Sequence, residues 1–114
     1  MDGICQKYWR QAAWTSTSLD SQTMLNGWNV TKYAYDAGRA IVSDPAGSSE
    51  LVMQVPYPAG SRNPSNSPVG GTGFYAAPLG DMTGITHITI QFDVYFPFDF
   101  SFVKGGKLPG TILC

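Results

Sequence analysis

The chain has 114 residues, of which 43% are hydrophobic and 13% charged, and this composition excludes a disordered, highly charged protein. Its formal net charge of −1 at pH 7 gives no general field to attract a polyanion, so we expect no nucleic-acid partner. We also expect no membrane partner, because no run of 18 apolar residues occurs. The 13 glycines, 8 prolines and many aromatic residues favour one all-β domain with many turns.

The first 27 residues show no regular hydrophobic period. Residues 6–14 are compatible with a short helix, whereas residues 16–27 are polar and rich in turn formers. We therefore expect an irregular segment over residues 1–27 and a β domain over residues 28–114. The start of the chain lacks the apolar core of a signal peptide, so the sequence leaves localisation unassigned. Asn29-Val30-Thr31 is a glycosylation sequon, which matters only if the chain enters the secretory route.

Short strand-like runs follow, and turn residues separate them. The six runs are Trp28–Tyr35, Arg39–Ser43, Glu50–Val55, Gly73–Ala77, Thr86–Phe96 and Phe100–Val103. The segment between residues 61 and 73 is rich in Pro, Asn, Ser and Gly and is the longest predicted loop.

The run from Thr86 to Phe96 alternates apolar and polar residues, which predicts a central strand. We expect one face of this strand to be buried, comprising Ile88, Ile90, Phe92, Val94 and Phe96. The opposite face carries His87, Thr89, Gln91, Asp93 and Tyr95. That polar face either meets solvent or forms the floor of a sugar-binding cleft. His87 is the single histidine, and a lone histidine on a strand is more often structural than catalytic.

Two lysines bracket a Gly-Gly pair near the end of the sequence. Lys104 and Lys107 flank Gly105-Gly106, and Pro109 follows. The glycines allow a ligand to approach the backbone, and the paired cations suit recognition of an anion. The alternative is a solvated turn whose lysines serve solubility.

The residues around these lysines resemble the central motif of polysaccharide lyase families 14 and 20, the alginate and glucuronan lyases, which are common in fungi. The motif is Asp93-Val-Tyr-Phe-Pro-Phe-Asp-Phe-Ser-Phe-Val-Lys-Gly-Gly-Lys-Leu-Pro-Gly110. Three upstream stretches, Val42–Ser49, Gln54–Ser61 and Gly70–Leu79, resemble the same families in the same order. The resemblance extends from about Trp28 to Gly110.

This resemblance implies a β-jelly-roll sandwich of antiparallel strands that binds an acidic polysaccharide, a uronate polymer, across a concave sheet. It implies cleavage by β-elimination without a cofactor or a metal, and an extracellular location. Lys107 is the residue that the resemblance suggests as the active-site cation, with Lys104 as its neighbour. Gln91 and Tyr95 are candidate substrate contacts because of the face on which they are predicted to lie.

The families also place a Ser-x-Arg pair and a Tyr-x-Tyr pair beyond the lysine motif, and this sequence has neither there. We therefore expect a truncated, incomplete sandwich that corresponds to the N-terminal half of the family fold and is inactive on its own. Whether the chain is an enzyme stays open. The alternatives are a lectin-like sandwich that binds acidic glycans, or a gene-model fragment with no function of its own. The sequence also leaves open whether Cys5 pairs with Cys114.

Overall fold

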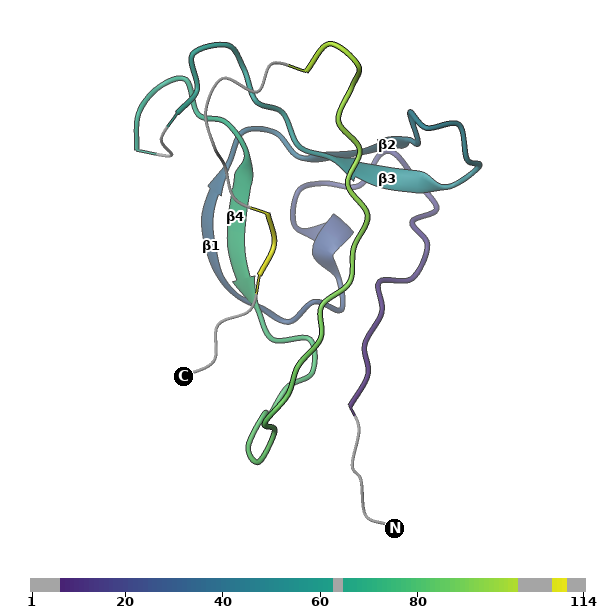
Figure 1. The fold of residues 1–114 in the computed structure, drawn as a ribbon, viewed down its shortest axis with the longest axis vertical. Helices are drawn as coiled ribbons and strands as arrows, with labels where there is room; N and C mark the ends of the chain where they lie inside the picture. The colour runs from purple at the N-terminus through teal and green to yellow at the C-terminus, as the bar shows by residue number, and fades with distance from the viewer. Residues whose placement is uncertain (1–6, 63–64, 101–107, 111–114) are drawn as a thin grey trace. The chain divides into compact units, whose positions relative to one another are not determined.

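The computed structural model describes residues 7–62, 65–100 and 108–110, and its secondary structure consists of four strands and one 3-10 turn (Figure 1). The strands are β1 (Val30–Asp36), β2 (Ala40–Ser43), β3 (Leu51–Gln54) and β4 (Thr72–Ala76). The turn, η1, spans Thr23–Leu25. No α-helix occurs in the described residues, which confirms the predicted all-β class.

The strands form two antiparallel sheets of two strands each. β1 pairs with β4 in a register that is shifted twice, between Val30 and Lys32 and between Tyr33 and Tyr35. β2 pairs with β3 as a regular hairpin, from Ala40 opposite Gln54 to Ser43 opposite Leu51. The two irregularities in β1 bend that strand, because each leaves a residue without a partner in the ladder.

A small core lies between the two sheets and is closed by the 3-10 turn. Met24, Leu25 and Ile41 are its fully buried members. The partly buried side chains that pack against them come from both sheets and from the segment before the turn: Trp14, Leu19, Trp28, Val30, Leu51, Met53 and Phe74. The two sheets thus form a partial antiparallel sandwich, as predicted.

Tryptophan side chains connect the N-terminal segment to this core. The Trp14 indole N–H donates to the carbonyl of Met24, at 2.8 Å. The Trp28 ring makes edge-to-face contacts with Trp9 and with Phe74. Residues 7–27 form no helix before η1, yet these contacts hold the segment against the sheets.

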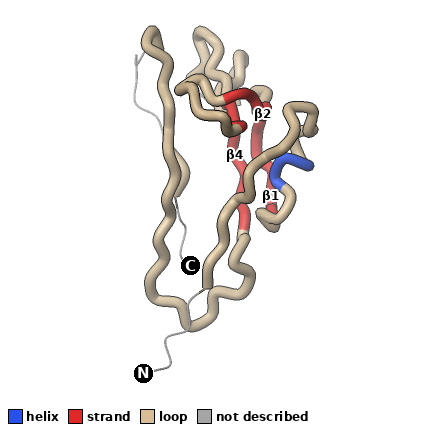
Figure 2. Tube along the Cα trace, turned by 90° about the vertical axis from the view of Figure 1, so that its right-hand side faces the viewer, coloured by secondary structure: helices blue, strands red, loops and turns tan. Residues whose placement is uncertain are grey.

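Contacts within the chain divide it into two compact units, residues 1–81 and residues 82–114. The first unit contains all four strands, the 3-10 turn and the core (Figures 1 and 2). This division follows contact density alone, and the predicted domain boundary after residue 27 stays a prediction.

The central strand predicted over residues 86–96 is absent, and this part of the sequence interpretation was wrong. Residues 85–97 form no strand, and Ile90, Phe92 and Val94 are 48%, 40% and 46% exposed. The physical reason is that alternation gives a segment two faces but supplies no partner for its backbone. No described strand pairs with this segment. The run predicted at Phe100–Val103 falls mostly outside the described residues, and Phe100 itself closes a turn with Pro97.

Candidate functional site

The structure describes only two of the four residues predicted to form the site. Lys104 and Lys107 lie outside the described residues. Gln91 and Tyr95 are exposed, and neither lines the two depressions of the first unit described below. The His87 ring Nδ1 lies 2.9 Å from the hydroxyl of Thr86. The roles assigned to Lys107, Lys104, Gln91 and Tyr95 stay predictions.

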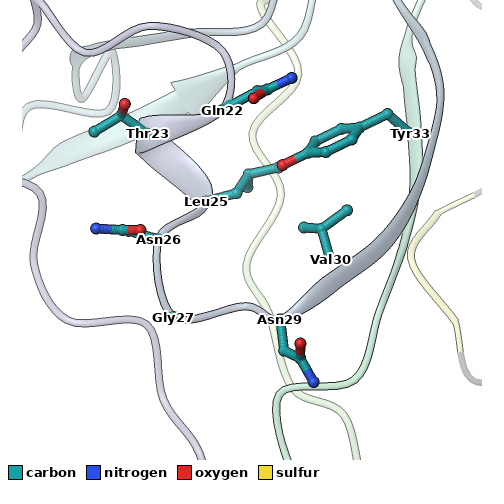
Figure 3. A pocket seen from close by; sticks show the side chains of 8 residues that line it. All are labelled: Gln22, Thr23, Leu25, Asn26, Gly27, Asn29, Val30 and Tyr33. Carbon is teal, nitrogen blue, oxygen red and sulfur yellow. The ribbon is translucent and has the colours of Figure 1, made fainter.

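The first unit carries two adjoining depressions on either side of Tyr33. The larger one, of about 430 Å³, lies between the 3-10 turn and the start of β1 (Figure 3). The smaller one, of about 190 Å³, lies between Ser21–Gln22 and the residues from Tyr33 to Arg39. Gln22 and Tyr33 line both depressions, so the two depressions adjoin at these side chains, which mark the candidate site.

Asp20 fixes the turn that forms one wall of the site. Its carboxylate accepts hydrogen bonds from the backbone N–H groups of Gln22, at 3.0 Å, and Thr23, at 2.7 Å. These bonds favour the charged carboxylate, so the Thr23 N–H first, then the Thr23 hydroxyl and the Gln22 N–H, lower the pKa of Asp20. With the 3-10 turn held in this way, Leu25 is buried in the core and Gln22 is exposed at the surface.

The opposite wall is the start of β1. Gly27 has a φ of 90° and Asn29 a φ of 51°, and this left-handed backbone redirects the chain from the turn into the strand. The Asn29 side-chain amide donates to the carbonyl of Ala77 at 3.1 Å, which holds the bend against the end of β4.

The close view shows which side chains face the larger depression. Tyr33 reaches from β1 toward the turn, with Leu25 and Val30 beside its ring and Gln22 near its upper edge (Figure 3). Thr23, Asn26 and Asn29 also line the depression, with Thr23 and Asn26 on the turn and Asn29 at the bend below it (Figure 3). The lining of the depression is therefore more polar than apolar, and it includes the phenol of Tyr33 and three amide residues, Gln22, Asn26 and Asn29.

Arg39 holds the smaller depression together. The residue is 5% exposed, and its side chain donates to the Ser21 carbonyl through Nε, at 3.0 Å, and through Nη2. Nη1 donates to the Thr72 hydroxyl at 2.8 Å and lies 3.5 Å from the Asp36 carboxylate. The guanidinium carbon also lies 5.7 Å from the Tyr33 ring centroid and 5.4 Å from that of Phe74. Because these contacts occupy the guanidinium, Arg39 positions Tyr33 rather than serving as a cation for a ligand.

Sequence reasoning did not identify Gln22, Tyr33 or Arg39 as members of a site. A signal for the tyrosine was present, because Tyr33-Ala34-Tyr35 places two aromatic residues on alternate positions of one strand. No signal pointed to Gln22, because its place beside Tyr33 depends on a contact between the turn and β1 that only the fold creates.

Across residues 7–62, 65–100 and 108–110, no three His, Cys, Asp or Glu side chains are grouped as metal ligands. Within those ranges, no helix is long and apolar enough to cross a membrane.

Comparison with known protein families identifies a match over the second part of the chain. The family model described as Polysaccharide lyase 14 matches residues 45–113, which is more than half of the chain. The matched span contains β3, β4 and the Lys104–Gly110 motif. No curated protein and no solved structure matches the chain.

Proposed function

We propose a function from one premise, which is that this chain belongs to the polysaccharide lyase 14 family. Membership implies a polysaccharide substrate. We propose that this substrate is a uronate polymer, an alginate or a glucuronan, and that the family reaction is β-elimination. The observation that carries the proposal is the family match across residues 45–113, which includes both lysines of the Lys-Gly-Gly-Lys motif.

The proposed reaction sets clear demands on a site. A base removes the proton at C5 of the uronate, the C4–O4 bond breaks, and a double bond forms between C4 and C5 while an acid protonates the departing oxygen. The C5 proton is only weakly acidic because the adjacent carboxylate is charged, so a cation must neutralise that carboxylate as charge develops.

Lys107 is the residue that we propose for this task, with Lys104 beside it. A lysine ammonium supplies a compact charge with three donors, which suits a sugar carboxylate. Gly105-Gly106 between the two lysines supports the assignment, because two residues without Cβ atoms let a polymer approach the backbone. Gln91 and Tyr95 are proposed as contacts to neighbouring sugar units.

Calorimetric binding of uronate polymers tests this proposal. We expect the chain to bind polymannuronate, polyguluronate or glucuronan, not a neutral β-glucan, with affinity that falls as salt rises. Lys107→Ala should weaken binding by about tenfold, because one charge-assisted hydrogen bond contributes about 1.5 kcal/mol or more. Lys104→Ala should weaken it less.

Lys32→Ala is the matched control for these variants. Lys32 is an exposed cation on β1 outside the matched span, where its ammonium lies 5.9 Å from the Tyr75 ring centroid. Its removal should leave uronate affinity unchanged. Equal binding of neutral and acidic polymers, or equal effects of all three alanine variants, would contradict the proposal.

A second candidate is a lectin-like activity at the depressions around Tyr33. The observation that favours it is the combination of a Tyr33 ring that is 45% exposed with the exposed side-chain amide of Gln22. An aromatic face and an amide are the groups that stack on sugars and bind their hydroxyls. Under this candidate, Tyr33→Ala and Gln22→Ala weaken glycan binding, whereas Lys107→Ala does not.

A further inference from the structure

The sequence contains one complete acceptor signal for N-linked glycosylation, and the structure shows where it lies. Asn29-Val30-Thr31 has the required asparagine and hydroxyl residue with a residue other than proline between them. Asn63-Pro64-Ser65 has the same outer residues, but its central proline excludes it. Asn63 therefore serves as an internal negative control for Asn29.

Asn29 is placed where an oligosaccharide can be carried without disturbing the core. The residue is exposed and lies directly before β1, at the rim of the depression beside Tyr33 (Figure 3). The neighbouring hydrophobic residue Val30 faces the core instead. Because Asn29 is exposed and is not among the packed side chains of the core, an attached sugar would extend into solvent and leave the core undisturbed.

The hydrogen bonding of Asn29 is compatible with the modification. Its Nδ2 donates one hydrogen bond, to the carbonyl of Ala77 at 3.1 Å. A side-chain amide has two N–H hydrogens, and glycosylation replaces one of them, so the other remains available for Ala77. The backbone at this position is also held, because the Ala77 N–H donates to the Asn29 carbonyl at 3.0 Å.

Thr31 completes the signal and is equally accessible. Its side chain is exposed, and its hydroxyl makes one hydrogen bond, to the Tyr75 carbonyl at 3.2 Å. The hydroxyl is needed for recognition by the transferase before the chain folds, and it can form the bond to β4 afterwards. Both side chains of the signal thus have a defined place in the folded protein.

From this geometry we infer that Asn29 is an N-glycosylation site of this protein, modified when the chain passes through the secretory pathway. The donor is a polyprenyl-diphosphate-linked oligosaccharide. A bond forms between Nδ2 of Asn29 and C1 of the first sugar, the bond from C1 to the diphosphate oxygen breaks, and the amide loses one proton. The inference does not depend on the proposed lyase function.

The position also gives the sugar a physical consequence. β1 pairs with β4 on one side, and within the described sheets no strand pairs with its other side. An open strand edge can pair with another chain and cause aggregation. A bulky, hydrated oligosaccharide at the first residue before β1 would hinder that pairing.

The test is translation of the full chain behind a cleavable secretion signal in the presence of microsomes. We expect a single form of lower gel mobility that an N-glycan amidase converts back, leaving aspartate at position 29 in the peptide mass spectrum. Thr31→Ser should retain the modification because it keeps the hydroxyl. Asn29→Gln and Thr31→Val should abolish it completely, and Asn63→Gln should have no effect.

Two results would overturn the inference. One is an unmodified wild-type chain in microsomes that glycosylate a known acceptor protein in the same reaction. The other is modification that persists in Asn29→Gln. A separate measurement tests whether the sugar leaves the core undisturbed. The thermal unfolding midpoint of the purified, glycosylated chain should be no lower than that of the amidase-treated chain.

Discussion

Arg39 and Tyr33 show how a buried charge can organise an exposed aromatic residue. The guanidinium of Arg39 connects the segment before the 3-10 turn, through Ser21, with β4, through Thr72. The same group lies against the Tyr33 ring, so the position of the tyrosine depends on the arginine. Arg39, the first residue of the predicted run Arg39–Ser43, is therefore a central polar contact of the first unit.

Replacing Arg39 by methionine should destabilise the chain by about 2 kcal/mol or more. Methionine keeps most of the apolar length but removes the hydrogen bonds to the Ser21 carbonyl and the Thr72 hydroxyl and the ion pair with Asp36, and each such hydrogen bond contributes about 1 kcal/mol. Urea unfolding followed by tryptophan fluorescence measures the change. Arg62→Met is the control, because Arg62 is exposed and its loss should change stability by less than about 0.5 kcal/mol. Equal effects of the two substitutions would refute this assignment.

The lowered pKa values of two aspartates, Asp20 and Asp44, indicate how the free energy of unfolding changes in acid. Hydrogen bonds from Thr23 and Gln22 lower the pKa of Asp20, and the Ser48 hydroxyl followed by the Ala46 N–H lowers that of Asp44. A carboxyl whose pKa is lower in the folded state contributes stability above its unfolded pKa, here 3.8, and that contribution is lost as pH falls through the folded value. We therefore expect the urea midpoint to fall as the pH drops below 3.8.

Asp20→Ser separates this effect from the turn geometry. Serine can still accept a hydrogen bond from the Thr23 N–H but does not titrate in this range. The variant should keep the turn and show a shallower loss of stability in acid than the wild type. A pH profile of unfolding that is identical for the two proteins would rule out the contribution of Asp20.

At the scale of elements, the β1–β4 pair depends on a glycine opposite a tyrosine. Tyr35 and Gly73 are register partners, and a Cβ added at Gly73 would lie 2.4 Å from the Tyr35 ring. The aromatic ring covers the glycine because no side chain competes for that space.

Gly73→Ala should therefore destabilise the chain by about 1–3 kcal/mol through overpacking. Thermal unfolding measures the loss, and Gly110→Ala is the control because a Cβ there meets nothing within 4 Å. Gly73→Ala should cost less stability in a chain that already carries Tyr35→Ala than it costs in the wild type, because the clash with the Tyr35 ring is then absent. If the glycine substitution costs the same with or without Tyr35, the steric account is wrong.

A pairing partner distinguishes the four strands of the first unit from residues 86–96, which form no strand. Each predicted run that became a strand has a partner within residues 30–76. The alternation over residues 86–96 is more regular than in any of those runs, yet no described strand pairs with it. Periodicity reports the two faces of a segment, whereas a strand also needs backbone hydrogen bonds from a neighbour.

For the molecule as a whole, we expect residues 1–114 by themselves to bind uronate polymers without cleaving them. The family resemblance places a carboxylate-binding arginine and proton-transferring tyrosines after the lysine motif, and residues 108–114 contain neither. Each such group contributes roughly a hundredfold or more to the rate, so the loss of several should put turnover below detection. The measurement is ultraviolet absorbance of unsaturated uronate ends.

A chimera provides the control for that measurement. Joining the C-terminal half of an active family member after Gly110 should restore elimination, and Lys107→Ala in the chimera should abolish it again. Clear turnover by residues 1–114 alone would show that the reacting groups lie elsewhere, with His87, Gln91 and Tyr95 the first to examine.

The sequence by itself determined the all-β class, four strand positions and the family, because turn residues, short apolar runs and the Lys104–Gly110 motif are local features. Only the tertiary structure decided which strands pair, that residues 86–96 form no strand, and that Gln22, Tyr33 and Arg39 adjoin. The reason is that these outcomes depend on contacts between residues far apart in the chain. Arg39 reaches Thr72, 33 positions away, and no local pattern records that contact.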